Sequence, residues 1–111
     1  MKEMNIAIIG GSGFVGSYLS NRLDLNNTPY VVFDTKLLNS DHQIVKLDVE
    51  DQDSLEQLSE SSLIINLAAV HRDDIRPLSR YDDVNVQGAI NVCNAARRHG
   101  IEKIIFTSSV A

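Results

Sequence analysis

The sequence predicts a doubly wound α/β fold, a three-layer α/β/α arrangement in which a parallel sheet has helices on both faces. Short β-branched apolar runs alternate with longer amphipathic stretches along the 111 residues. The first run is apolar throughout, as is typical of strands that are buried on both faces. Alternating strands and helices favour parallel pairing with right-handed crossovers. The expected strand order is therefore 3-2-1-4-5, with ligands bound where that order reverses between strands one and four.

Five apolar runs predict the strands, which are expected at 5–9, 30–33, 44–47, 63–69 and 103–107. Between the first two, Val15, Leu19 and Leu23 recur at helical spacing and predict a helix over 14–25. The Asn-Asn-Thr-Pro segment that follows ends this helix. A short acidic helix is expected over 51–60.

The longest helix is expected over 80–99, with Gly100 as its C-terminal stop. Its expected inner face consists of Val84, Gly88, Val92, Ala95 and Ala96. The single cysteine, Cys93, lies within this apolar pattern and is predicted to be a buried small residue. One cysteine also excludes an internal disulfide and a multi-cysteine zinc site, and no metal site is expected.

Length and composition fit one domain over residues 1–111, without room for a second. The chain is 43% hydrophobic and 23% charged, as in ordinary globular proteins. Its net charge is −5, and residues 41–60 alone hold seven acids and one base. Without a basic stripe, nucleic acids and anionic membranes are poor partners. Because the chain has neither a membrane-length apolar run nor a signal peptide, we expect a cytoplasmic protein.

A glycine-rich segment, residues 10–16, follows the first strand and opens the first helix. Its spacing fits G-x-G-x-x-G from Gly11 and G-x-x-G-x-x-G from Gly10, and spacing alone does not choose between them. Either pattern gives a tight turn and a helix N-terminus that attracts a pyrophosphate. No Lys-Ser/Thr pair follows, which excludes a P-loop. The alternative is a turn that only joins strand to helix.

Two carboxylates end the second and third strands. Asp34, 18 residues beyond Gly16, is positioned to accept hydrogen bonds from both hydroxyls of a ribose. Its charge would repel a 2′-phosphate, which favours NAD over NADP, although Lys36 nearby could weaken that preference. Asp48 could reach an adenine amino group. The alternatives are a turn-forming role for Asp34 and a cap or turn role for Asp48.

The chain resembles the extended short-chain dehydrogenase/reductases, the NAD-dependent epimerase/dehydratase group that acts mostly on nucleotide-sugars. The resemblance covers essentially the whole chain. Its motifs are residues 10–17, Asp34, residues 47–49, 66–69, 85–92 and 103–109. It implies a Rossmann-like, NAD(P)-binding domain over residues 1–111, with the chain ending after strand five and the substrate domain absent.

The resemblance also implies which residues meet the cofactor. It favours the glycine pattern that starts at Gly10, and it assigns adenine contacts to Asp48 and Val49. The implied cofactor-binding residues are Gly10, Gly13, Phe14, Val15, Gly16, Asp34, Asp48, Val49, Leu67, Ala68, Ala69, His71 and Ser108. For His71 the alternative is an exposed loop histidine. Asn85 corresponds to an Asn near the active-site wall, with a hydrogen bond on the helix as the alternative.

The end of the chain carries the implied catalytic residue. In the family the second member of a Ser/Thr pair after strand five contacts the substrate hydroxyl, which corresponds to Ser109. A Tyr-x-x-x-Lys pair then acts as acid and base. This chain has no such pair, because its tyrosines are followed four residues later by Arg22, Asp34 and Asn85.

The function expected from the resemblance is the NAD-binding portion of an NAD-dependent nucleotide-sugar epimerase or dehydratase, with the 111-residue chain inactive by itself. Two alternatives stay open, a non-catalytic dinucleotide-binding module and an NAD(P)-dependent reductase of a non-sugar carbonyl. The expected partners are a nucleotide-sugar substrate in the full-length enzyme and a second copy of the chain. Self-association is expected through strand five, because its apolar run would be a sheet edge.

Overall fold

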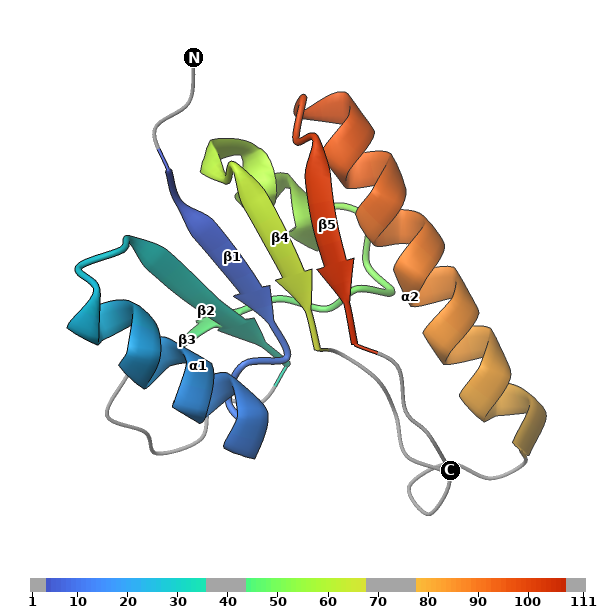
Figure 1. Ribbon diagram of the computed structural model, residues 1–111. Coiled ribbons are helices and arrows are strands. Elements are labelled where there is room, and N and C mark those ends of the chain that lie inside the picture. The colour runs from blue at the N-terminus through green and yellow to red at the C-terminus, as the bar shows by residue number, and fades with distance from the viewer. Residues whose placement is uncertain (1–3, 36–43, 68–77, 108–111) are drawn as a thin grey trace.

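The computed structural model describes residues 4–35, 44–67 and 78–107, and for 78–84 only the backbone. The predicted fold class is confirmed, since one sheet of five parallel strands has the order β3-β2-β1-β4-β5 (Figure 1). The elements are β1 Ile6–Ile9, α1 Phe14–Leu25, β2 Tyr30–Asp34, β3 Ile44–Lys46, the 3₁₀ helix η1 Ser54–Glu60, β4 Leu63–Asn66, α2 Leu78–Arg98 and β5 Lys103–Phe106.

The strand register brings the carboxyl ends of the three central strands to one edge of the sheet. Ile9 at the end of β1 is paired with Phe33 of β2 and with Asn66 of β4. The arrowheads of β1, β2, β4 and β5 in Figure 1 point toward this edge. Segments that follow β1, β2 and β4 in the sequence therefore lie close together, although they are far apart along the chain.

The sheet separates two hydrophobic clusters, because alternate residues of a strand point to opposite faces. On one face Ala7 and Ile9 of β1 pack with η1 and with Val92 of α2. On the other face Ile6 and Ile8 pack with Leu19 and Leu23 of α1. Helices on both faces produce the predicted three layers.

The acidic segment differs from the predicted helix over 51–60, since only Ser54–Glu60 is helical and it is a 3₁₀ helix. In the residues before η1, aspartate side chains accept hydrogen bonds from backbone N–H groups two residues later. The Glu50 N–H donates to Asp48 Oδ1 at 2.9 Å, and the Asp53 N–H donates to Asp51 Oδ1 at 3.1 Å. These local hydrogen bonds compete with an α-helix.

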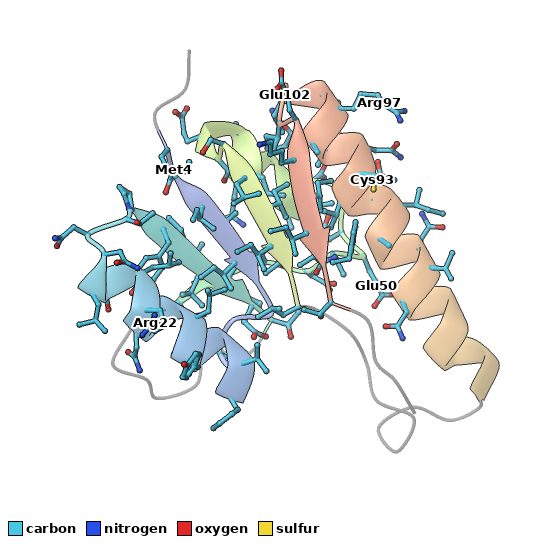
Figure 2. All side chains as sticks on the ribbon, in the orientation of Figure 1. Met4, Arg22, Glu50, Cys93, Arg97 and Glu102 are labelled. Atoms are coloured by element: carbon cyan, nitrogen blue, oxygen red, sulfur yellow. The ribbon has the colours of Figure 1, made fainter. Side chains whose placement is uncertain are left out.

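The prediction that Cys93 is a buried residue is wrong. Cys93 is exposed on α2 (Figure 2), because the helix turns its Val92 and Ala95 side toward the sheet. Val15 is 59% exposed, because α1 buries Gly16 and Ser20 instead. In both helices small residues at the interface let the backbone approach the sheet and turn a neighbouring apolar residue outward.

The ends of the two long helices agree closely with the predictions. α1 spans the predicted 14–25, and α2 begins two residues before the predicted start and ends one before the predicted end. Gly100 has φ +70°, a conformation that favours glycine after a helix. Neither helix in the described part of the chain is long and apolar enough to cross a membrane.

Candidate functional site

The glycine turn after β1 is attached to the end of β2. Gly10 has φ +78°, in the left-handed region that glycine adopts without strain. Its N–H donates to the Phe33 carbonyl oxygen at 2.7 Å, and the Gly11 N–H donates to the same oxygen at 3.3 Å. The turn thus reverses the chain at the carboxyl end of β1, and these two hydrogen bonds attach the turn to β2.

Gly16 and Gly13 have different physical reasons to be glycine. A Cβ on Gly16 would lie 2.3 Å from the Gly11 carbonyl oxygen, so a side chain there would push α1 away from the turn. A Cβ on Gly13 would meet nothing within 4 Å, and its φ of −82° is open to any residue. Neither fold nor conformation demands glycine at position 13, which fits a backbone left bare for a ligand.

The N-terminus of α1 is built like an anion site. Gly13 is the N-cap and makes no side-chain capping bond, and the first turn has no acidic residue. The first N–H that bonds within the helix is that of Ser17, to the Gly13 carbonyl oxygen at 2.9 Å. The preceding N–H groups, including those of Phe14 and Val15, are the ones a helix leaves for other partners. Phe14, the first residue of α1, is 88% exposed.

Asp34 at the end of β2 contacts the glycine turn directly. The Ser12 N–H and the Ser12 hydroxyl both donate to Asp34 Oδ2, at 3.1 Å and 2.6 Å. The carboxylate is therefore oriented by the turn, and the two motifs are parts of one surface. The pattern that predicted Asp34 contained no signal for this contact with Ser12, which only the folded chain brings within reach.

Asp48 and Val49 form a second part of the same edge. Asp48 Oδ1 accepts the Glu50 N–H, so the turn role left open in the sequence is present. The Asp48 N–H donates to Ser54 Oγ at 3.1 Å. The Val49 carbonyl oxygen accepts a hydrogen bond from Asn91 Nδ2 at 2.8 Å. Glu50, at the end of this turn, is labelled near the carboxyl ends of the strands in Figure 2.

Leu67 follows β4 at this edge, half-buried, and its N–H donates to the Ile9 carbonyl oxygen at 2.8 Å. Five predicted site residues lie outside the described residues: Ala68, Ala69, His71, Ser108 and Ser109. Among the described residues, no group of three or more His, Cys, Asp or Glu could hold a metal ion.

The sheet order and the glycine turn define a doubly wound α/β domain. In such domains ligands bind at the carboxyl ends of the strands where the strand order reverses, which here is between β1 and β4. The sequence pattern of the NAD dependent epimerase/dehydratase family matches residues 6–111. The chain belongs to that family.

Two curated relatives illustrate the similarity. The chain is 43% identical over 114 residues to the N-acetyl-alpha-D-glucosaminyl-diphospho-ditrans,octacis-undecaprenol 4-epimerase of Escherichia coli O157:H7, covering 96% of this chain and 33% of that protein. It is 32% identical over 116 residues to a putative UDP-glucose 4-epimerase of Methanocaldococcus jannaschii. That match covers 94% of this chain and 37% of that protein. The chain thus spans about a third of the length of these relatives.

Solved structures share the fold. A UDP-glucose 4-epimerase of Thermotoga maritima with UDP-glucose is 26% identical with a TM-score of 0.82, covering 96% of this chain and 38% of that one. The enzyme of Thermus thermophilus in complex with NAD is 23% identical, with the same TM-score and coverage. At that lower identity the likeness concerns the fold alone.

Proposed function

We propose that residues 1–111 form one NAD-binding domain, the cofactor-binding portion of an NAD-dependent nucleotide-sugar epimerase or dehydratase. The contact of Ser12 with Asp34 is the observation that carries this proposal. This contact places a turn suited to a pyrophosphate beside a carboxylate suited to a ribose. One dinucleotide can therefore bind to the turn and to the carboxylate at the same time. Membership of the NAD dependent epimerase/dehydratase family supports the same cofactor.

The residue roles follow the geometry of the edge. Gly10 makes the turn, Gly16 lets α1 approach it, and Gly13 leaves room for the pyrophosphate, which the backbone of Phe14 and Val15 faces. Asp34 accepts the ribose hydroxyls, and its negative charge selects NAD over NADP. Asp48 and Val49 face the adenine. The remaining cofactor contacts are assigned to Leu67, Ala68, Ala69, His71 and Ser108.

Substrate chemistry belongs to the whole protein. When bound, NAD supplies a hydride acceptor for a carbon of the sugar. Ser109 would hydrogen-bond a hydroxyl of that sugar, and residues outside this chain would supply the acid and base. The UDP-glucose in the Thermotoga maritima structure supports a nucleotide-sugar as the substrate class.

Calorimetric titration tests the cofactor assignment. The chain should bind NAD more tightly than NADP, and Asp34→Ala should weaken NAD binding by about 1.5–3 kcal/mol, the scale of hydrogen bonds to a charged group. Asp53→Ala is the matched control, because Asp53 is exposed and makes no side-chain capping bond. Equal or tighter binding of NADP, or an equal loss in the control, would refute the proposal.

A further inference from the structure

We infer that Gln87 and Asn91 of α2 are positioning residues that set the turn of residues 48–50 and thereby control recognition of the adenine 6-amino group. The inference rests on the proposed function, because it concerns the adenine end of the same site. Neither residue belongs to the cofactor contacts assigned above. Both act through Val49 and Asp48.

Asn91 is the anchor of this arrangement. Its side chain is 3% exposed, and Nδ2 donates to the Val49 carbonyl oxygen at 2.8 Å, across 42 residues of sequence. The opposite orientation of the amide would set Oδ1 against that carbonyl oxygen and bring two acceptors together. Two acceptors that face each other at a partly buried position lose a hydrogen bond and repel, which is costly. The orientation of the Asn91 amide is therefore essential to the position of the turn.

Gln87 holds that orientation. Its Nε2 donates to Asn91 Oδ1 at 2.9 Å from one helical turn earlier, the spacing at which side chains of a helix meet. Gln87 is exposed, so it can be changed without opening the core. The two amides form a chain of hydrogen bonds from the helix surface to the Val49 backbone.

Gly88 lets α2 approach the same residue. A Cβ on Gly88 would lie 2.7 Å from Val49 Cγ2 and 3.4 Å from Val49 Cβ. Two contacts with α2 therefore position Val49. The Val49 side chain packs against Gly88, and the Val49 carbonyl oxygen accepts a hydrogen bond from Asn91. Any shift of Asn91 is passed to Val49 and to its neighbour Asp48.

The Asp48 carboxylate takes its direction from this turn. Oδ1 accepts the Glu50 N–H, one residue beyond Val49, and the Asp48 N–H is held by Ser54 Oγ. A displaced Val49 would rotate the peptide groups on either side and turn the carboxylate with them. A changed carboxylate direction should affect a ligand with an adenine amino group more than one without it.

The test compares NAD with nicotinamide hypoxanthine dinucleotide, in which an oxygen replaces the adenine 6-amino group. The unaltered chain should prefer NAD. Gln87→Glu sets a carboxylate oxygen against Asn91 Oδ1, and Asn91→Asp sets one against the Val49 carbonyl oxygen. Each should weaken NAD binding by about five- to tenfold, the scale of one lost hydrogen bond, and leave the analogue nearly unchanged. Asn94→Asp is the control, an exposed position of the same helix with the same added charge.

Equal weakening of both ligands, or none, would overturn the inference, because a merely structural role cannot distinguish them. Amide exchange of residues 48–50 without ligand provides a separate readout. Faster exchange in Gln87→Glu than in Asn94→Asp supports the positioning role, and unchanged exchange contradicts it. If the unaltered chain binds neither dinucleotide, the proposed function and the effect on adenine recognition are both refuted. Amide exchange of residues 48–50 would in that case test only whether Asn91 positions the turn.

Discussion

At the scale of single residues, the surroundings of Tyr30, at the start of β2, raise the pKa of its hydroxyl group. Its hydroxyl donates to Asp24 Oδ1 at 2.8 Å. Burial, and then the hydrogen bond and negative charge of Asp24, raise the pKa of Tyr30 from 10.0 to about 12. Burial and Asp24 favour the neutral phenol and outweigh the opposite effect of Ser20, so the raised pKa ties ionisation of this tyrosine to unfolding.

The stability that Tyr30 contributes should be fully present below its unfolded pKa of 10.0 and should be lost as the pH rises through about 12. Ultraviolet titration of tyrosinate, with circular dichroism to follow folding, checks this. Tyr30→Phe should remove the late ionisation step. Tyr18→Phe, at an exposed position on α1, should retain it. A Tyr30→Phe chain with an unchanged titration would contradict the assignment.

Two glycines of one turn should respond differently to the same substitution. Gly16→Ala sets a methyl group against the Gly11 backbone and should destabilise the fold by about 1–3 kcal/mol, the usual cost of overpacking. Gly13→Ala should change stability by less than about 0.5 kcal/mol, because its methyl group meets nothing, yet it should weaken NAD binding. Urea unfolding and NAD titration separate the two effects. A destabilised Gly13→Ala chain, or one that binds NAD normally, would refute the distinction.

At the scale of elements, η1 is held to α2 by both charge and apolar contact. Glu56 Oε1 lies 3.0 Å from Arg98 Nη2, and Glu56 Oε2 lies 3.4 Å from His99 Nε2. Leu55 and Leu58 of η1 are fully buried in the cluster that includes Val92. Because exposed ion pairs contribute little and buried leucines much, we expect the apolar contact to dominate.

Glu56→Gln should lower the free energy of unfolding by less than about 1 kcal/mol, and Leu58→Ala should lower it by about 2–5 kcal/mol. Urea unfolding curves measure both. The effect of Glu56→Gln should also shrink with added salt, because the pair is exposed. A larger loss for Glu56→Gln than for Leu58→Ala would mean that the charge cluster holds the two elements together.

At the scale of the whole molecule, β5 is the last strand on one side of the described sheet. Among the described strands, β4 alone is paired with β5. Ile105 and Phe106 are 50% and 45% exposed. Figure 1 shows α1 beside β1 and β2, with no described helix in front of β5. An apolar edge with unpaired backbone groups invites pairing with another chain.

We predict that the chain self-associates through β5, so its molar mass by light scattering should rise with concentration. Phe106→Ser should reduce this association. Phe14→Ser is the control, because Phe14 is the more exposed phenylalanine and lies on α1. A chain that stays monomeric at high concentration, or an equal effect of both variants, would show that β5 is not the contact.

The 111-residue chain should show no epimerase, dehydratase or dehydrogenase turnover with NAD and a panel of nucleotide-sugars. The physical reason is the lack of a Tyr-x-x-x-Lys pair in the sequence, which leaves the substrate hydroxyl without its expected base. A coupled assay for product and for NADH measures this. Steady-state turnover that is lost in Ser109→Ala would mean that another group supplies the base.

The sequence by itself determined the sheet order, the span of α1 and the positions of the glycine turn, Asp34 and Asp48 after their strands. These features depend on hydrophobic period and glycine spacing, which are local properties of the chain. The expected truncation, catalytic role and self-association stay predictions. Ala68, Ala69, His71, Ser108 and Ser109 lie outside the described residues, so their assignments stay proposals as well.

Only the tertiary structure decided which apolar residues face outward and which polar residues touch. Val15 and Cys93 fit an apolar helix pattern, but the choice of inner face depends on which neighbours are small enough to meet the sheet. The contact of Ser12 with Asp34 spans 22 residues, and that of Asn91 with Val49 spans 42. Such contacts leave no periodic signal in the sequence, because they arise only when parallel strands bring distant turns to one edge.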